Sequence, residues 1–172
     1  RKICDHISTV NFPPTTMSYN NLQKENIKGN QNIFIGDVMY DMVLNAKLEK
    51  PEMILPRSFI LCTIHRQENT DNPSYLKKIF LTLIELSKKI CVIIPLHPRT
   101  KKKLVDHGLY EKVKANLNII EPQSYSSLLY LIKKSEIAIS DSGGVPKEAA
   151  FLNVPSTFIG DNIVWQELVD QR

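Results

Sequence analysis

The sequence has few cysteines, no long apolar run and little excess of charge. Its three cysteines, Cys4, Cys62 and Cys91, are odd in number and lack Cys-x-x-Cys spacing, so we expect buried thiols in a reducing compartment. No apolar stretch approaches the ~20 residues that a membrane-spanning helix needs. The 22 basic and 18 acidic residues leave a net charge of +4, which is too weak and scattered for a nucleic-acid surface. We therefore expect a cytoplasmic protein without membrane or nucleic-acid partners.

Short β-branched runs alternate with segments of helical period along nearly the whole chain. The helical pattern is clearest over residues 73–89, where apolar residues recur on one stripe and lysines lie away from it. The runs expected to form strands are 9–12, 32–35, 59–64, 91–95, 118–120, 137–140 and 156–159. This alternation predicts an α/β fold, with a Rossmann-like parallel sheet and helices on both of its faces.

The charged segment 47–57 carries two prolines and interrupts this alternation, as is typical of a linker or hinge. We predict a main domain over residues 51–172. Residues 1–50 are then the end of a preceding domain and the connection out of it. The chain begins with Arg1 and stops at Arg172 within a helical pattern, so we expect it to be a piece of a longer protein.

A glycine pair lies between the sixth expected strand and the helix that follows. The loop contains Ser142, Gly143 and Gly144, and Pro146 opens the helix. Glycines let backbone amides approach a ligand, and the positive end of a helix favours an anion. The loop therefore predicts a phosphate site, with Glu148 about one turn into the helix and within reach of a ribose hydroxyl. It matches neither the Gly-x-Gly-x-x-Gly nor the Walker pattern, and a tight turn without a ligand is the alternative.

Polar side chains follow other expected strands as well. His65, Arg66 and Glu68 follow the third one, and His97 and Gln123 follow the next two. The carboxyl ends of parallel strands meet at one edge, so these corners suggest a shared crevice that could supply proton transfer and phosphate neutralisation. A helix-capping loop with an Arg66–Glu68 surface pair is the alternative for the first corner, and a helix cap is the alternative for His97. The two histidines lack cysteine or acidic partners at ligand spacing, so we expect no metal.

Several blocks of residues stand in an order and at spacings that one enzyme family shares. They are Arg1, Asp5, His6 and Ser8; Phe12, Pro14 and Thr15; Gly36, Asp37, Val38 and Asp41; Thr63, His65, Arg66, Glu68 and Asn69; His97, Pro98 and Arg99; Glu121, Pro122 and Gln123; and Asp141 to Gly144 with Lys147, Glu148 and Ala149. Over nearly its whole length the chain thus resembles the non-hydrolysing UDP-N-acetylglucosamine 2-epimerase family. The block from Gly36 to Asp41 also looks like the subgroup acting on diacetamido-uronic acid sugar nucleotides.

The resemblance implies an enzyme with two Rossmann-like domains of the glycosyltransferase-B type, of which this chain is the second domain. A UDP-sugar would bind in the cleft between them. A base takes the proton at C2, UDP leaves from C1, and a glycal intermediate is reprotonated on the opposite face before UDP adds back. No cofactor is needed. A homodimer and a place in cell-surface polysaccharide biosynthesis are implied as well.

The resemblance also assigns site residues. His65 is the family's catalytic-site histidine. The other residues would bind the UDP-sugar: Ser142, Gly143 and Gly144 the diphosphate, Glu148 the ribose, Gln123 with the backbone around Leu128 the uracil, and His97 the nucleotide. Further candidates are Arg66, Glu68 and Trp165.

The chain departs from the family pattern at 160–164, where Asp161 persists but an arginine, an acid and a threonine are lost. The family's other acid-base carboxylates and its phosphate-binding arginine lie upstream of Arg1, so we expect the chain alone to be inactive. Two alternatives stay open. One is a UDP-sugar-dependent glycosyltransferase of the same architecture, although its glutamate-rich motif is absent. The other is a non-catalytic nucleotide-binding remnant, which the altered stretch favours.

Overall fold

The structure, a computed structural model, describes residues 2–27, 29–161 and 165. The chain divides into two compact units, Arg1–Asn45 and Ala46–Arg172. Residues 46–58 form neither helix nor strand, as the prolines and charges of this segment predict. The division therefore falls at the start of the predicted linker.

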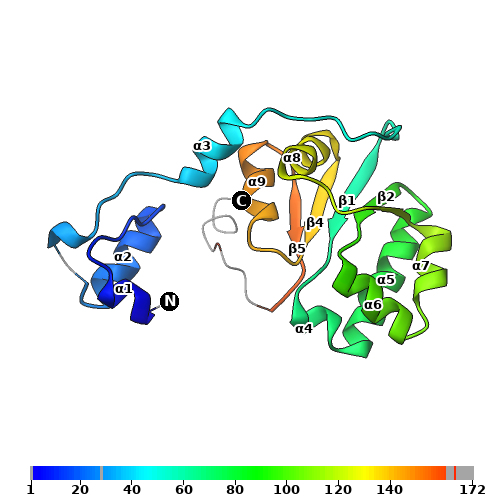
Figure 1. The fold of residues 1–172 in the computed structure, drawn as a ribbon, viewed down its shortest axis with the longest axis horizontal. Helices are drawn as coiled ribbons and strands as arrows, with labels where there is room; N and C mark the ends of the chain where they lie inside the picture. The colour runs from blue at the N-terminus through cyan, green and yellow to red at the C-terminus, as the bar shows by residue number, and fades with distance from the viewer. Residues whose placement is uncertain (1, 28, 162–164, 166–172) are drawn as a thin grey trace. The chain divides into compact units, whose positions relative to one another are not determined.

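The first unit consists of short helices (Figure 1). They are α1 (Lys2–Ile7), α2 (Thr16–Lys24), the 3-10 turn η1 (Gly29–Gln31) and α3 (Val38–Asn45). The Thr15 hydroxyl caps α2 by accepting a hydrogen bond of 3.0 Å from the amide of Ser18. Such a cap satisfies one of the amides that the first turn of a helix leaves open.

The two strands expected in this unit do not form. A single parallel bridge, Asn11↔Asn32, joins the two runs. The side chain of Asn32 accepts from the side-chain amide of Asn11 and donates to the carbonyl of Ile27, whereas Ile33 and Phe34 are 45% and 55% exposed. Among the described residues of the unit, no further strand pairs with these β-branched and aromatic residues, so the pattern alone does not make a sheet.

The second unit is built on a five-stranded parallel sheet in the order β3-β2-β1-β4-β5. Its strands are β1 (Phe59–Thr63), β2 (Cys91–Pro95), β3 (Asn118–Ile120), β4 (Ile137–Ser140) and β5 (Ser156–Phe158). All five were predicted to within one residue at either end. All five residues of β1 are buried, as expected of a central strand covered on both faces.

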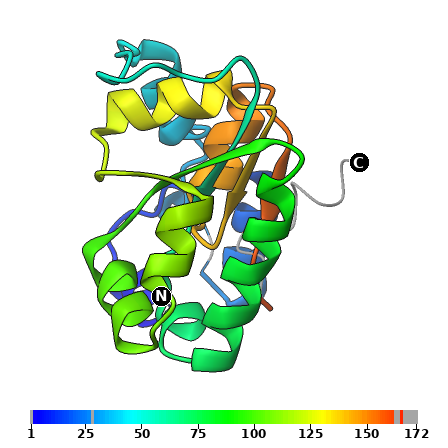
Figure 2. The same cartoon turned by 90° about the vertical axis from the view of Figure 1, so that its right-hand side faces the viewer.

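Helices cover both faces of this sheet (Figure 1). One layer is formed by α5 (Pro73–Ser87), α6 (Pro98–Asp106) and α7 (Tyr110–Asn116). In Figure 2 this layer faces the viewer. The helices α8 (Tyr125–Lys134) and α9 (Val145–Phe151) form the other. The predicted Rossmann-like arrangement is confirmed, and the helix predicted over 73–89 is α5.

One hydrophobic core of this unit lies between the sheet and the layer that contains α5. The apolar stripe of α5 packs against the central strands: Leu76, Phe80 and Leu83 are each at most 2% exposed. Asn72 starts the helix at the right place, because its side-chain oxygen accepts from the amides of Ser74 and Tyr75.

The strand order places a crevice between β1 and β4. The chain moves outward from β1 to β2 and β3, and then returns to the other side of β1 for β4 and β5. The loops that follow β1 and β4 therefore diverge, and ligands of such sheets bind at this point. Thr63 pairs with Ser140, so both strands end at the same level beside the crevice.

All three cysteines are free, but the expectation that they are buried is confirmed only in part. Cys62 is buried and Cys91 half-buried, whereas Cys4 is exposed, because α1 has no buried face in this structure. Burial, with a smaller effect of the Asp141 charge, raises the pKa of the Cys62 thiol far above its ordinary value. Within the described residues, no helix has both the length and the apolarity to cross a membrane.

Candidate functional site

A hollow of about 280 Å³ lies at the carboxyl ends of the central strands. It is lined by Thr63, His65, Pro95, His97, Pro122, Gln123, Leu128, Ser142, Gly144, Val145 and Glu148. These residues come from four successive corners of the sheet. The hollow therefore brings together seven of the predicted site residues, whose individual roles stay predictions: His65, His97, Gln123, Leu128, Ser142, Gly144 and Glu148.

The glycine loop is closed by its own serine. The Ser142 hydroxyl oxygen accepts hydrogen bonds from the amides of Gly144 at 3.0 Å and Val145 at 3.2 Å. The helix mouth thus differs from the open row of amides that the sequence suggested. With both lone pairs engaged, the hydroxyl has its proton left to donate. An anion in the hollow would meet this hydroxyl first.

The loops after β1 and β4 are joined through Asp141. Its fully buried carboxylate accepts from the amides of His65, at 3.0 and 3.1 Å to its two oxygens, and of Arg66 at 2.8 Å. The side-chain amide of Asn69 donates to it at 3.1 Å. The sequence had placed Asp141 only in the glycine-loop block. A carboxylate that directly follows a buried strand at the switch point is the signal that could have found this role.

Two histidines face each other in the hollow. The ring centroids of His65 and His97 are 6.1 Å apart. The Nδ1 atom of His97 accepts from the amide of Arg99 at 3.2 Å and so caps α6. The helix-cap alternative and the hollow-facing prediction for His97 are therefore both present in the structure.

The chain is similar to known proteins over nearly its whole length. A family model described as UDP-N-acetylglucosamine 2-epimerase matches residues 1–172. The chain belongs to this family. A UDP-N-acetylglucosamine 2-epimerase homolog of Methanococcus maripaludis is 42% identical over 98% of the chain and 50% of that protein. The UDP-2,3-diacetamido-2,3-dideoxy-D-glucuronate 2-epimerase of Pseudomonas aeruginosa is 35% identical over 98% of the chain and 48% of that protein.

Solved structures of UDP-N-acetylglucosamine 2-epimerases are also similar to the chain. The crystal structure of Methanocaldococcus jannaschii UDP-GlcNAc 2-epimerase in complex with UDP-GlcNAc and UDP is similar at a TM-score of 0.89 and 37% identity. The likeness covers 99% of this chain and 50% of that one. The chain thus spans about half the length of the relatives it matches.

In this family member, Glu148 faces the hollow from α9. It is 7% exposed and is hydrogen-bonded to the side chain of Tyr125. Burial raises the pKa of Glu148 above its ordinary value, and the bond from Tyr125 opposes that rise. Burial, followed by the Glu148 charge, raises the pKa of Tyr125. The carboxylate is therefore poised to accept a further hydrogen bond, which would replace some of the water it has lost.

Trp165 supports the glycine loop from outside the hollow. Its indole nitrogen donates to the carbonyl of Gly143 at 2.7 Å, and its ring lies 3.4 Å from the ammonium nitrogen of the buried Lys147. Neither Trp165 nor Gly143 lines the hollow. The peptide between Gly143 and Gly144 is held at its carbonyl by Trp165 and at its amide by Ser142.

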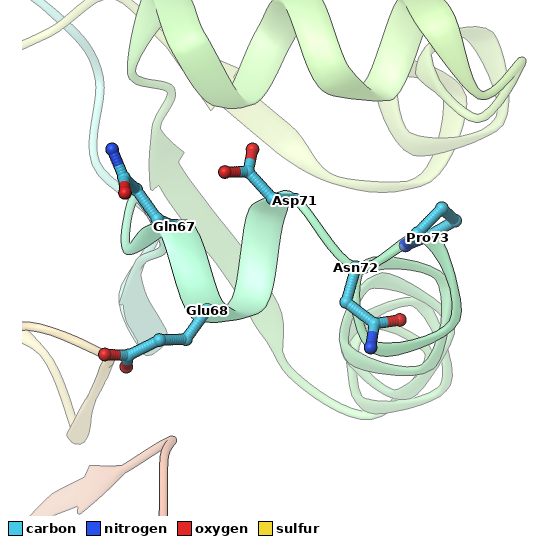
Figure 3. A pocket seen from close by; sticks show the side chains of 5 residues that line it. All are labelled: Gln67, Glu68, Asp71, Asn72 and Pro73. Carbon is cyan, nitrogen blue, oxygen red and sulfur yellow. The ribbon is translucent and has the colours of Figure 1, made fainter.

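Arg66 and Glu68 also lie outside the hollow. The guanidinium of Arg66 is 5.5 Å from the centre of the Phe158 ring and 3.8 Å from the Glu68 carboxylate, which is the surface pair considered above. Glu68 lines a second, shallow pocket with Gln67, Asp71, Asn72 and Pro73. Figure 3 shows the Glu68 and Asp71 side chains pointing apart, so the two carboxylates do not converge on one ligand position in this pocket. Across the described residues, no group of three or more metal-ligating side chains is close enough to hold an ion.

The departure from the family pattern has a local consequence at Gly160. A Cβ atom built there would lie 2.8 Å from the Phe158 ring, so the family's arginine would require that ring to move. Asn162, Ile163 and Val164 lie outside the described residues.

Proposed function

We propose that the protein containing this chain interconverts UDP-N-acetylglucosamine, or a related UDP-2-acetamido sugar, with its manno epimer. The route is elimination of UDP followed by its re-addition, and it requires no cofactor. The observation that carries the proposal is the hollow at the β1/β4 switch point, which His65 and the Ser142 loop enter together. Family membership supports it.

The Ser142 loop is proposed to hold the diphosphate. The Ser142 hydroxyl has its proton free for a phosphate oxygen, because the amides of Gly144 and Val145 occupy its lone pairs. The Gly143 amide has no acceptor among the described residues. Although Gly143 does not itself line the hollow, its neighbours Ser142 and Gly144 do, and its amide would be the second donor once the diphosphate occupies the loop. Fixed donors at the point where charge grows on a leaving diphosphate favour its departure.

The nucleoside is proposed to lie deeper along the same hollow. Glu148 would accept from the ribose hydroxyls, since it is buried and, among the described residues, Tyr125 is its side-chain hydrogen-bond donor. Gln123, whose Nε2 atom donates to the carbonyl of Glu121 at 2.8 Å, would present its oxygen to the uracil. The backbone around Leu128, which also lines the hollow, would complete the uracil site.

His65 is proposed as the acid-base group on one face of the sugar. Elimination and reprotonation on opposite faces need proton-transfer groups on both sides of the ring. Two carboxylates beside the hollow are proposed for other tasks: Asp141 holds backbone amides of the His65 loop, and Glu148 is assigned to the ribose. The second face is therefore proposed to be served by another part of the whole protein. Residues 1–172 alone are expected to be inactive.

Several wider properties are proposed on the same footing. Residues 1–50 would end the N-terminal domain and connect it to the nucleotide-binding domain at 51–172. The exposed apolar side chains of the first unit, among them Ile3, Ile7 and Leu44, would be covered in the complete protein, which we propose is a homodimer. A cytoplasmic location fits the free thiols. The product, an activated sugar, would serve cell-surface polysaccharide biosynthesis.

Incubation with UDP-N-acetylglucosamine in deuterated water tests the reaction. The complete polypeptide that carries residues 1–172 is expected to place deuterium at C2 of both epimers. A glycosyltransferase would leave hydrogen at that carbon. A remnant, the alternative that the altered stretch at 160–164 favours, would bind UDP without any exchange. Either of these outcomes would overturn the proposal.

A further inference from the structure

We propose that Asp141 is a positioning residue that fixes the tautomer and orientation of the His65 imidazole. The proton would be held on Nδ1, toward Asp141. Nε2 is then the nitrogen that exchanges a proton with a ligand in the hollow. The catalytic meaning of this inference rests on the proposed function, whereas the tautomer itself can be tested without it.

The hydrogen bonds divide unequally between the two carboxylate oxygens. Oδ2 accepts from the amides of His65 and Arg66 and from Asn69. Oδ1 has only the shared His65 amide at 3.1 Å and the His65 Nδ1 atom at 3.5 Å. A carboxylate oxygen has room for about two donors. Oδ1 is therefore the acceptor available to the imidazole.

The Nδ1 contact lies at the outer limit of a hydrogen bond. The side chain of His65 is 45% exposed, and its backbone is already anchored to the same carboxylate. A small rotation of the ring shortens the contact without moving the chain. Catalytic hydrogen bonds are commonly long before a ligand packs against them.

The chemistry of the pair selects one tautomer. In a neutral imidazole one nitrogen donates and the other accepts, and an ionised carboxylate only accepts. The nitrogen nearest Asp141 therefore carries the proton. His97, the ring on the other side at 6.1 Å between centroids, has its own Nδ1 engaged by the amide of Arg99, so it does not compete for Asp141.

This arrangement gives His65 a defined task. The lone pair of Nε2 faces the ligand and can take the proton from C2, with the C2–H electron pair staying on the sugar. The imidazolium that forms has its charge beside a buried carboxylate, which stabilises it. The same nitrogen returns the proton in the reverse direction. An unfixed ring would spend part of its time with Nε2 already protonated.

Nitrogen-15 NMR of the imidazole side chains measures the tautomer directly. The chain has four histidines, and the His65 signals are assigned by their absence in His65→Gln. Wild-type His65 in its neutral form is expected to be protonated on Nδ1. In Asp141→Asn the population is expected to shift toward Nε2–H, and in the control Asp71→Asn, whose exposed carboxylate pairs with Arg99 and Lys103, it is expected to stay unchanged.

Two results would overturn the inference. One is a wild-type His65 protonated on Nε2, which requires no variant and so decides the matter even where Asp141→Asn does not fold. The other is an identical tautomer population in the wild type and a folded Asp141→Asn.

Kinetics separate positioning from a merely structural role. In the complete protein, Asp141→Asn is expected to lower kcat on the order of 100-fold or more. UDP affinity should stay the same or rise, since a negative charge beside the diphosphate is removed. Parallel loss of kcat and UDP affinity would indicate only a structural role and would overturn the inference. If the wild-type enzyme exchanges no deuterium at C2, the proposed function fails while the tautomer result stands by itself.

Discussion

The indole nitrogen of Trp165 donates a hydrogen bond of 2.7 Å to the carbonyl oxygen of Gly143. Replacing Trp165 by Phe keeps an aromatic ring for Lys147 but removes this donor. The Gly143–Gly144 peptide then loses one of its two anchors, and a hydrogen bond within a protein contributes about 1 kcal/mol. Trp165→Phe is therefore expected to weaken UDP binding by roughly 3- to 10-fold in calorimetry.

The control for this substitution is Tyr110→Phe. It removes the hydroxyl of a second aromatic ring that has a lysine over it: Tyr110, on α7, lies under the ammonium group of Lys101 and does not line the hollow. Its UDP affinity is expected to equal that of the wild type. Trp165 is the only tryptophan of the chain, so a change of its fluorescence on UDP addition would report the loop directly. Equal affinity of Trp165→Phe and wild type would remove Trp165 from the support of the loop.

Ser142 has two separable tasks, a helix cap and an anion donor. Ser142→Ala removes both, since the hydroxyl accepts from Gly144 and Val145 and is the expected donor to phosphate. Loss of a cap costs about 1 kcal/mol in the free energy of unfolding, which urea titration measures. UDP affinity is expected to fall by roughly 10-fold as well, as for loss of a hydrogen bond to a charged group.

Asn72→Ala is the matched control for the cap. Asn72 caps α5 in the same way, through the amides of Ser74 and Tyr75, but it lies outside the hollow. The free energy of unfolding should fall by a similar amount while UDP affinity is unchanged. If Ser142→Ala behaves like Asn72→Ala in both measurements, Ser142 is a cap alone and the diphosphate binds elsewhere.

The strands of the second unit could be predicted because of where they lie. A central strand of a sheet covered on both faces is buried along its whole length, so the apolar run Phe-Ile-Leu-Cys-Thr predicts β1 directly. The run at Ile33 to Ile35 has a similar composition but stays about half exposed. The composition of a segment indicates that it favours a β-strand with a buried face. It does not indicate whether a neighbouring strand and a covering layer are present.

The sequence predicts which loops at the carboxyl ends of the strands come together to form the site. Parallel strands end at one edge, which brings His65, His97 and the glycine loop together whatever their side chains do. The partners of individual atoms could not be predicted this way. Asp141 meets the amide of Arg66 across 75 residues of sequence, and Ser142 turns back onto its own helix. Both depend on side-chain geometry that only the folded backbone supplies.

Glu148 is expected to make stability fall as pH rises. Burial raises its folded-state pKa above the unfolded value, so the folded state binds more protons between the two values and loses stability as the carboxyl ionises. The loss of stability begins near the ordinary glutamate pKa, about 4.3, and is complete above the raised pKa of the folded state. Glu148→Gln should therefore gain stability over the wild type at pH 7 but not at pH 3.5, as measured by urea unfolding.

The exposed Glu111 of α7 provides the comparison. Glu111→Gln is expected to change the free energy of unfolding by less than about 0.5 kcal/mol at either pH. A Glu148→Gln variant that is less stable than the wild type at pH 7 would mean that the bond to Tyr125 outweighs desolvation.

The same variant tests the ribose assignment. A carboxylate that accepts from a ribose hydroxyl should distinguish UDP from 2′-deoxy-UDP, since the deoxy ligand leaves it unpaired in a buried place. The wild-type chain is expected to prefer UDP by roughly 10-fold, and Glu148→Gln to lose most of that preference. Equal binding of both nucleotides to the wild type would move the ribose away from Glu148.

His65 is expected to be needed for turnover and not for binding. Its backbone amide is held by Asp141 and its side chain is partly exposed, so His65→Ala should keep the fold and the UDP affinity. Loss of a general acid-base group costs on the order of 100- to 10,000-fold in rate. C2 deuterium exchange by the complete protein should fall by that factor, whereas His107→Ala, at the exposed end of α6, should exchange at the wild-type rate. Undiminished exchange by His65→Ala would assign the proton transfer to another group.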